Sequence, residues 1–532
     1  MSGSRAAGNS PVLVGCDIGT SAVKTVLSDA EGRLLARSVA EHPMHRPQPG
    51  WAENDPDDWY RGMARTVREA LAAAAVDPAR FAALCIACQR EPVVLAGADG
   101  APLARSLSWT DRRAAAEADE VAARFGRPWL IETTGMAPVH GMSLAHLLWF
   151  QRHRPDLWRS VRQIRFAKDY VLHRLTGCRA TDATTPGRSS MLDIHHQRWS
   201  HEICDAFRID SGMLPAIGGR PWEPVAELPR ARAAELGLPP GLPVAMGGSD
   251  DACATLGCGA ILPGEICIGT GTAASWRTVL AECRPDQSAR GDVSAHVVPD
   301  RYIHEVAIES TGSSLRWLRD TLAMPAGTGA QEGFERLVRS AEAVGCGADG
   351  LFFFPFVDGA ARAPRYAANA SAAYLGVASG HTRAHLVRAL LEGVAFQHRA
   401  TMSLLSDAGP ANLRNPIGIG DGETRSPLWT QIKADVLGTP LRVPRITDLA
   451  AAGAAILAGI AGGVFGDAAD GIRRIVHWEH QYDPDPHRSA VYAELSAEYE
   501  RVYRLIEQTF RPYRRPGRGG DITSGHMQGA QA

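Results

Sequence analysis

Short apolar runs separated by glycine-containing turns open the chain, a pattern typical of antiparallel strands. The runs are Val12–Asp17, Val23–Ser28 and Arg33–Val39, and Gly-Thr-Ser and Asp-Ala-Glu-Gly turns separate them. We therefore predict a three-stranded meander. A helix should follow, because Asp55 suits an N-cap, Pro56 suits the first helical position and apolar residues then recur every fourth residue.

A similar strand, turn and strand begin again in the second half of the chain. Glu265–Ile268 reads as a short strand, Gly269–Thr272 as a turn and Ala274–Val279 as a returning strand. This echo indicates two lobes of one architecture, and the alternative is two unrelated hairpins. Later helical patterns are predicted at Arg383–Leu405, from Pro427 onward, at Asp448–Ala461 and at Tyr492–Phe510.

Length supports two lobes as well, because 532 residues exceed what one hydrophobic core holds. We place the lobes at residues 11–257 and 258–512. The ends, 1–10 and 514–532, are polar or rich in glycine, and we predict that they are disordered.

Composition narrows the class of partner. The chain is 45% hydrophobic and 21% charged, as ordinary soluble globular proteins are, and its net charge of -2 favours neither nucleic acid nor an acidic membrane as partner. It has no apolar stretch of about 18 residues and no apolar signal core at its start, so we expect a cytoplasmic protein outside the membrane. Its 10 cysteines are scattered, which favours reduced thiols. Even the closely spaced Cys85 and Cys88 lie in an apolar run that predicts a buried strand.

Three glycine-rich segments have the composition of phosphate-binding turns: Asp17–Ser21, Gly269–Thr272 and Gly418–Gly422. Glycine lets backbone N–H groups approach a phosphate, and Ser and Thr hydroxyls add donors. Each segment alone also fits an ordinary turn. Together they predict a nucleotide held between the lobes, without the P-loop motif.

Asp17 ends the first predicted strand directly before such a turn. A carboxylate there can hold Mg²⁺, directly or through water, beside phosphate oxygens, and Lys24 on the next strand can neutralise charge. The alternative is that Asp17 only stabilises its own turn.

Asp250 and Asp251 form the sharpest polar cluster. They follow the apolar run Leu242–Met246 on a Gly-Gly-Ser turn and precede a helical pattern. Such a rigidly held carboxylate suits a general base that faces a substrate hydroxyl, and we assign this role to Asp250. The alternative is that one of the two aspartates caps the helix.

Gln89, Arg90 and Glu91 stand at the end of the apolar run Leu84–Cys88, which is predicted to be a buried strand. A neighbouring donor and acceptor at a strand end can grip vicinal hydroxyls. A surface salt bridge is the alternative reading of the same two residues.

Taken in order, these segments resemble the FGGY carbohydrate kinases. Asp17–Lys24 is similar to the family's first phosphate motif, Gly247–Asp250 to the motif of the catalytic base and Gly269–Gly271 to the second phosphate motif. The resemblance extends from about residue 11 to about residue 512. Further landmarks that resemble the family are Trp109–Arg113, Lys168–Tyr170, Leu175–Gly177, Leu192–Asp193 with Trp199, Glu392–Gly393 and Ser426–Asp435.

The resemblance implies an α/β fold with two ribonuclease H-like lobes of the actin/Hsp70/sugar-kinase type around a central ATP cleft. It implies ATP and Mg²⁺ as cofactors, a small sugar or polyol as substrate and, as a possibility, a homodimer. The N-terminal lobe would bind the sugar and the C-terminal lobe the nucleotide. Asp250 would be the base, and Asp17 would hold Mg²⁺ through water. The implied nucleotide ligands are Thr20, Ser21, Lys24, Gly269, Thr270, Gly312, Gly422 and Ser426. The implied sugar ligands are Arg90, Glu91, His140, Asp250 and Asp251.

Four departures from the family pattern stand out. Asp421-Gly-Glu423 replaces a Gly-Gly-Gly sequence, and Gly359–Pro364 lacks the glutamate of its motif. Asp251 stands where an asparagine often follows the base, and His146 stands where a lysine often lies near the substrate.

The substrate pattern is mixed. Gln89–Pro92 differs from the Gln-Met-His-Gly of xylulose kinases and is similar to glycerol kinases, whereas Val139–Met142, with Gly141 in place of a tyrosine, is closer to xylulose kinases. We therefore predict a ketopentose such as xylulose as the substrate. The alternatives are a glycerol or short-polyol kinase and a catalytically degenerate relative that binds a nucleotide or sugar.

Overall fold

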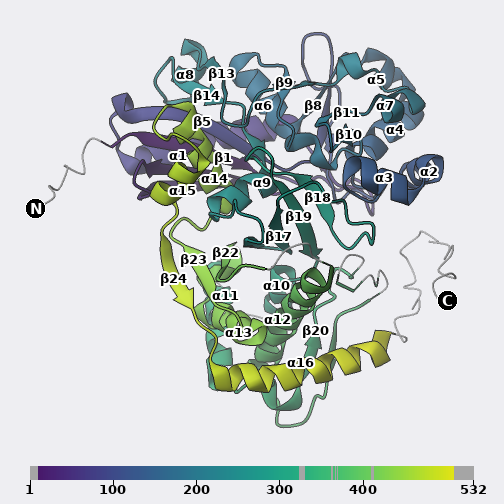
Figure 1. The fold of residues 1–532 in the computed structure, drawn as a ribbon, viewed down its shortest axis with the longest axis vertical. Coiled ribbons are helices and arrows are strands. Elements are labelled where there is room, and N and C mark those ends of the chain that lie inside the picture. The colour runs from purple at the N-terminus through teal and green to yellow at the C-terminus, as the bar shows by residue number, and fades with distance from the viewer. Residues whose placement is uncertain are drawn as a thin grey trace, which may run out of the picture.

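The computed structural model describes residues 10–322, 330–360, 364–365, 367, 370–408 and 413–507 (Figure 1). The predicted disordered tails, apart from Ser10, lie outside the described residues. The same holds for Ala361, Arg362 and Ala363 of the altered 359–364 motif and for the last three residues of the predicted closing helix.

The first half of the chain forms a seven-stranded sheet around the predicted meander. β1 (Val12–Ile18) pairs antiparallel with β2 (Ala22–Asp29), which pairs antiparallel with β3 (Leu34–Glu41). On the other side of β1 lies β5 (Phe81–Cys88), which is parallel to it, followed by β14 (Pro243–Ala245). β13 (Pro224–Glu227) extends the edge, and β15 (Gly248–Ser249) pairs with the end of β5.

The second half repeats this arrangement. β16 (Ile266–Thr270), β17 (Ala274–Leu280) and β19 (Tyr302–Ile308) form an antiparallel meander, and β22 (Ile417–Asp421) and β23 (Leu441–Pro444) continue it in parallel beside β16. β18 (Asp292–Ala295) and β24 (Trp478–Tyr482) form the edges. Both sheets therefore place three antiparallel strands beside two parallel ones, so the predicted fold class is confirmed and the reading as unrelated hairpins is wrong.

The remaining elements join and cover the two sheets. The helices that carry candidate site residues or pack beside them are α1 (Pro56–Ala74), α9 (Asp250–Gly257), α10 (Gly312–Thr321), α12 (Arg383–Ala408), α13 (Pro427–Leu437) and α14 (Leu449–Ala461). The others are α2 (Ala115–Phe125), α3 (Arg127–Thr134), α4 (Ser143–His153), α5 (Pro155–Ser160), α6 (Ala167–Thr176), α7 (His201–Ala206), α8 (Arg230–Leu236), α11 (Ala330–Ser340), α15 (Ala468–Ile475) and α16 (Pro486–Glu507). The short strands are β4 (Glu53–Asn54), β6 (Val93–Ala96), β7 (Ser106–Leu107), β8 (Gln163–Phe166), β9 (Ala180–Thr181), β10 (Leu192–Asp193), β11 (Arg198–Trp199), β12 (Ala216–Ile217), β20 (Phe352–Phe354) and β21 (Ala373–Leu375).

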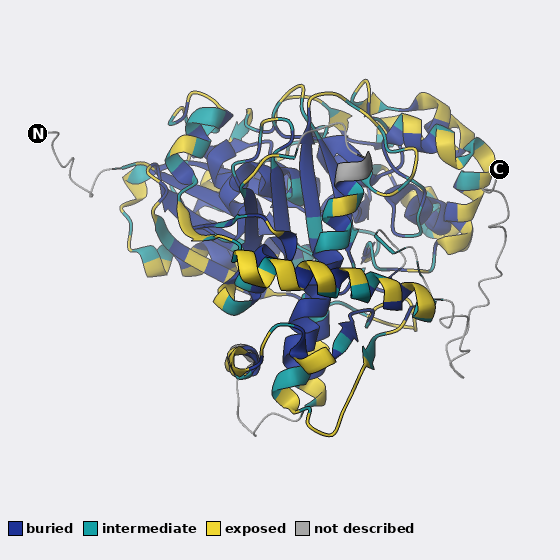
Figure 2. Ribbon diagram, turned by 60° about the horizontal axis from the view of Figure 1, so that its bottom comes forward, coloured by how far each residue is buried: buried dark blue, intermediate teal, exposed yellow. Residues whose placement is uncertain are grey.

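Local sequence signals account for the helix boundaries. Asp55 caps α1 as predicted, with its side chain accepting from the Asp57 N–H. The structure differs from the sequence predictions at the start of α16, which is Pro486 and not Tyr492, and at two predicted turns. β16 extends through Gly269 and Thr270, and residues 418–421 of the third predicted phosphate-binding turn lie in β22 (Ile417–Asp421). The central strands of both sheets are buried, whereas the edge strand β24 and the outer face of α16 are exposed (Figure 2).

A close helix crossing connects the halves of the chain. α14 comes from the C-terminal half, yet it packs against β1, β5 and α9 of the N-terminal half (Figure 1). Glycines make this approach possible: a Cβ on Gly453 of α14 would lie 1.8 Å from the Cys253 carbonyl oxygen, and one on Gly15 of β1 would lie 2.1 Å from the Ala451 carbonyl oxygen. The crossing brings the first residue of α9, Asp250, and the N-cap of α14, Asp448, to the same side of the molecule as Asp17.

Candidate active site

The first phosphate-type turn lies where β1 ends and β2 begins. Gly19 N–H donates to the Ala22 carbonyl at 3.0 Å, which closes the turn and leaves Thr20 half-buried and Ser21 exposed. The Thr20 hydroxyl accepts from the Trp109 indole N–H at 2.9 Å. Trp109 therefore fixes the orientation of Thr20 at the cleft.

Asp17 lies in a strongly acidic part of the cleft. Its carboxylate is 3.8 Å from the Lys24 ammonium, and that ammonium is 3.5 Å from Asp448. Burial raises the pKa of Asp17 to about 6; Lys24 opposes this rise, and the nearby carboxylates of Asp421 and Asp448 add to it. The charged groups around Asp17 therefore include more carboxylates than cations.

Asp17 fits a Mg²⁺ ligand. Its Oδ1 is buried and has no hydrogen-bond partner among the described residues. Within the part of the chain that the structure describes, no three carboxylate, thiol or imidazole groups form a closed metal cage. Mg²⁺ is commonly held by one or two carboxylates together with phosphate oxygens and water, so one aspartate beside a phosphate turn is a suitable donor set.

The base candidate lies at the start of α9. Parallel pairing of Ser249 with Cys88 places Asp250 beside the end of β5. Ser249 caps the helix by accepting from the Ala252 N–H, so the alternative that Asp250 or Asp251 is the cap is wrong. Burial raises the pKa of Asp250 well above its usual value, and the neighbouring charge of Asp251 raises it further.

Asp251 is held in a buried ionic network. The Arg90 guanidinium lies 2.5 Å from Asp251 and 2.5 Å from Glu305, and Arg277 Nε donates to Asp251 at 2.5 Å. Ser275 donates to the other oxygen of Glu305 at 2.9 Å. Arg90 is 4% exposed, so reading Arg90 and Glu91 as a surface salt bridge is wrong.

Glu91 belongs to a neighbouring buried pair. Its carboxylate lies 2.6 Å from Arg188 Nε, and Arg188 also pairs with Asp292 of β18. Arg90 therefore joins Asp251, in the N-terminal half of the chain, to Glu305 of the second sheet. Arg188 likewise joins Glu91 to Asp292.

The glycine motifs of the second half converge on Thr270. Its hydroxyl donates to the Gly420 carbonyl at 2.6 Å and accepts from the Glu423 N–H at 3.3 Å. Gly312 N–H donates to the Gly271 carbonyl at 3.0 Å, and a Cβ on Gly312 would lie 2.2 Å from that oxygen. Three segments far apart in sequence are thus brought together, and Gly269 lies within this group.

The two acidic departures have separate surroundings. Glu423 pairs with Lys433 of α13 in a buried position, which neutralises it. Asp421, in contrast, lies beside Lys24 and Asp448, and burial raises its pKa. A Cβ added to Gly422, which lies between them, would make only an ordinary van der Waals contact with the Thr270 carbonyl oxygen, at 3.7 Å. Ser426 caps α13 by accepting from the Trp429 N–H at 3.1 Å.

The segment with His140 and His146 lies behind the phosphate turn. A Cβ on Gly141 would lie 2.1 Å from the Trp109 carbonyl oxygen, so His140 adjoins the residue that orients Thr20. His146 is fully buried, burial lowers its pKa to about 4, and neither of its ring nitrogens has a partner among the described residues. It is therefore a neutral imidazole.

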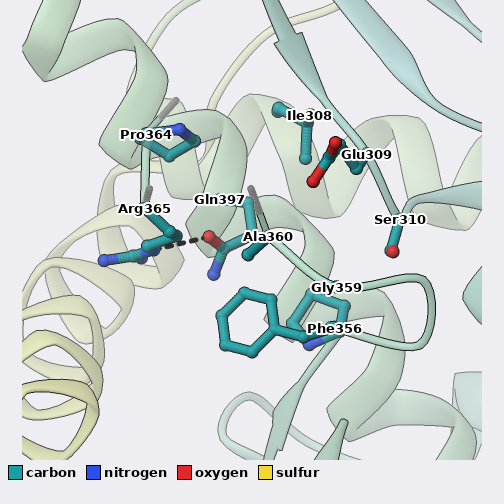
Figure 3. Close-up of a pocket in the computed structure, with 10 residues that line it drawn as sticks. Ile308, Glu309, Ser310, Phe356, Gly359, Ala360, Pro364, Arg365 and Gln397 are labelled. Atoms are coloured by element: carbon teal, nitrogen blue, oxygen red, sulfur yellow. Dashed lines mark hydrogen bonds between the residues drawn. The ribbon is translucent and has the colours of Figure 1, made fainter. Parts of the chain in front are cut away.

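A small pocket lies beside the 310–314 segment (Figure 3). Ser310 forms one wall, and Arg365, which donates to Gln397 at 2.7 Å, forms another. Its free volume of about 10 Å³ admits about one water molecule, so the pocket is too small for a sugar or nucleotide.

Sequence reasoning missed the charged partners in this site: Arg188, Arg277, Asp292 and Glu305. Arg277 and Glu305 lie inside the mostly buried strands β17 and β19, and a charge inside such a strand was the available signal for these two residues. Their partners are far away in sequence, with 215 positions between Arg90 and Glu305.

Comparison with known proteins places these features in a family context. The N-terminal domain of the FGGY family of carbohydrate kinases matches residues 12–257, and the C-terminal domain of that family matches residues 264–462. Together these matches cover most of the chain.

Individual relatives match over almost their whole length. The xylulose kinase of Bacillus subtilis (strain 168) is 26% identical over 491 residues, 92% of this chain and 96% of that protein. The autoinducer-2 kinase of Escherichia coli (strain K12) is 28% identical over 504 residues, 92% and 94% of the two chains. The crystal structure of xylulose kinase from Rhodospirillum rubrum superimposes with a TM-score of 0.81 at 29% identity, covering 94% of this chain and 100% of that one.

Proposed function

The chain belongs to the FGGY family of carbohydrate kinases, and we propose that it transfers the γ-phosphoryl group of ATP to a hydroxyl of xylulose or a closely related ketopentose. Sugar kinase activity follows from the family. The choice of sugar rests on one observation, namely that xylulose kinases match the chain over more than nine-tenths of its length in both sequence and structure.

Asp250 is the proposed base. It accepts the proton of the sugar hydroxyl as the oxygen–phosphorus bond forms and the bond between the β- and γ-phosphates breaks, with ADP as the leaving group. The position of Asp250 beside β5 supports this role, because the phosphate turn at Thr20 ends the neighbouring strand. The ion pair between Arg90 and Asp251 fixes the positions of these two charged groups beside the proposed base.

The nucleotide is proposed to bind across both turns. Thr20, Ser21 and Lys24 would contact the phosphates from one side, and Gly269, Thr270 and Gly312 from the other. Gly422 and Ser426 would flank the adenosine, with Ser426 acting through its cap of α13. Mg²⁺ beside Asp17 would neutralise phosphate charge.

The sugar is proposed to lie against the first half of the chain. Arg90 retains one buried nitrogen, Nη1, without a partner among the described residues, and this donor is available to a hydroxyl. Glu91, His140 and Asp251 complete the proposed sugar ligands. The charged side chains that we place beside Asp250, namely Arg90, Asp251 and Glu91, are each paired with an opposite charge. None of these three is left to pair with a charged substrate, which favours a neutral sugar over a sugar acid.

Several organisational predictions remain proposals. We keep residues 11–257 and 258–512 as the two lobes, and we keep the cytoplasm as the location and a homodimer as the assembly. None of the helices in the described ranges is both long and apolar enough to cross a membrane.

A panel of acceptors in a coupled ADP-release assay tests the substrate. Xylulose, glycerol, gluconate and autoinducer-2 should be compared, because relatives of this chain with these substrates in their names match it. We expect the highest kcat/KM with xylulose. Turnover of hexonates or deoxy sugars, with none of pentuloses, tetruloses or polyols, would overturn the proposal.

Calorimetry with ATP and Mg²⁺ tests the degenerate alternative. We expect nucleotide binding, because Asp17, Thr20, Asp250 and Thr270 are all present at the cleft. An absence of binding would favour a protein that has lost catalysis.

A further inference from the structure

Gln89 lies at the centre of the site, between the base and the phosphate turn. It directly follows β5, whose last residue, Cys88, pairs in parallel with Ile18 of β1 on one side and with Ser249 of β15 on the other. The next residues in these two registers are Gly19 and Asp250. Gln89 N–H donates to the Ile18 carbonyl at 3.0 Å, which holds the backbone in this position.

The Gln89 side-chain amide has no hydrogen-bond partner in the described part of the chain. The residue is 2% exposed, and neither Oε1 nor Nε2 is bonded. Gln397 is equally buried but is fully engaged: its Oε1 accepts from Arg365 and its Nε2 donates to Tyr499. A buried amide without partners is costly, so an unpaired amide at a substrate cleft points to a ligand that supplies the missing bonds.

The two free atoms restrict the chemistry of that ligand. Oε1 needs a hydrogen-bond donor, which a sugar hydroxyl provides and an ionised phosphate does not. Nε2 needs an acceptor, and the unpaired Nη1 of Arg90, the next residue, offers a second donor. A polyol with adjacent hydroxyl groups satisfies an acceptor and two donors placed together.

We propose that Gln89 is a further substrate-contacting residue, whose carbonyl accepts from one sugar hydroxyl while its NH₂ donates to the oxygen of the hydroxyl that is phosphorylated. This pair of bonds orients the accepting oxygen between Asp250 and the Gly19–Thr20 turn. The inference rests on the proposed function, since it assumes that the sugar binds beside Asp250.

Gln89→Met tests the proposal because it keeps the shape of the side chain and removes both polar atoms. Binding of xylulose by calorimetry should weaken about tenfold or more, and kcat should fall about tenfold or more. Binding of ADP should stay unchanged. The melting temperature should be unchanged or higher, because the variant removes an unsatisfied buried amide.

Gln151→Met is the matched control. Gln151 is partly buried away from the cleft on α4, and its amide donates to the Phe207 carbonyl at 3.3 Å. This variant should lower the melting temperature and leave kcat and xylulose binding unchanged. Gln89→Met should therefore lower activity without lowering stability, and Gln151→Met should lower stability without lowering activity.

Gln89→Glu is a second, independent variant. It preserves the size of the side chain and adds a carboxylate beside Asp250, so the pKa of Asp250 should rise and the acidic limb of the kcat/KM profile should move to higher pH. Wild-type kcat and xylulose binding in Gln89→Met, or an unmoved acidic limb in Gln89→Glu, would overturn the inference. Loss of ADP binding with a lower melting temperature in Gln89→Met would also overturn it, because that result defines a structural role.

These outcomes separate the inference from the proposed function. If wild-type protein phosphorylates no sugar of the panel, the proposed function fails. If wild-type protein is active on xylulose and Gln89→Met is equally active, only the role of Gln89 fails.

Discussion

Two adjacent carboxylates, Asp250 and Asp251, differ in their ion pairs. Asp251 is paired with Arg90 and Arg277, whereas no cation lies within ion-pair distance of Asp250 in the described structure. Burial and the charge of Asp251 both raise the pKa of Asp250. The raised pKa of Asp250 supports it, and not Asp251, as the proposed base.

Replacing Asp251 with Asn should change the pH profile. The base is active when ionised, so kcat/KM falls as the pH decreases through the raised pKa of Asp250. Removing the neighbouring negative charge lowers that pKa, and the acidic limb of the profile should move to lower pH. The measurement is kcat/KM for the sugar from pH 5 to 9, with wild-type protein alongside. A limb that stays in place or moves to higher pH would contradict the assignment.

Sequence alone singled out Asp250, Arg90 and Glu91 as candidates, because their chemistry and local context are visible within a few residues. It did not identify how they are paired. Glu305 and Asp292, the partners of Arg90 and Arg188, are brought to them by a second sheet far along the chain. The alternative that one of the two aspartates caps α9 was wrong, because Ser249 and both aspartates are good capping residues and only the backbone path decides among them.

At the scale of elements, the crossing of α9 and α14 determines where Asp250 and Asp448 lie at the starts of these helices. Both helices have glycine at the contact, and Gly257 approaches the Leu449 carbonyl as closely as Gly15 approaches Ala451. The local periodicity predicted α14 from Asp448 and its composition indicated tight packing. The partner could not be predicted, since α14 packs on the sheet of the other half of the chain.

Gly453→Ala should therefore destabilise the protein strongly. The added Cβ would lie 1.8 Å from the backbone carbonyl of Cys253, which cannot move without shifting α9. We expect a loss of about 2 kcal/mol or more in unfolding free energy, measured by urea denaturation.

Gly466→Ala is the control for this substitution. No atom lies within 4 Å of a Cβ added at Gly466, and its backbone N–H bond to Asp470 is kept. Stability should change by less than about 0.5 kcal/mol. Equal effects of the two substitutions would contradict the role given to the crossing.

At the scale of the whole molecule, buried charges tie the two sheets together around the cleft. Arg90 reaches Glu305 of β19, and Arg188 reaches Asp292 of β18. Although burial by itself raises the pKa of Glu305, the three arginines Arg90, Arg188 and Arg277 hold it well below its usual range. The proposed sugar ligands Arg90 and Glu91 are thereby linked to the half of the chain that carries Thr270.

This linkage predicts that sugar and nucleotide bind cooperatively. Xylulose should tighten the binding of ADP about fivefold or more in wild-type protein, and ADP should tighten xylulose by the same factor. Glu305→Gln weakens the tie to Arg90 and should reduce this factor, measured by calorimetry in both orders of addition.

Glu479→Gln provides the matched control for the cooperativity measurement. Glu479 pairs with Arg445 at 3.0 Å on the surface, where both side chains are 47% exposed. The coupling factor should remain at its wild-type value in this variant. Undiminished coupling in Glu305→Gln would show that the ionic tie does not transmit binding between the two halves.

The most direct test of the account is phosphoryl transfer to xylulose by wild-type protein and by Asp250→Asn. Both proteins are incubated with ATP, Mg²⁺ and xylulose, and the sugar phosphate and ADP are measured together. Wild-type protein should form the two products in equal amounts, and the variant should lose a factor of about 10²–10⁴ in kcat while its ATP affinity is retained. Absence of sugar phosphate with wild-type protein, or near-normal turnover by Asp250→Asn, would contradict the account.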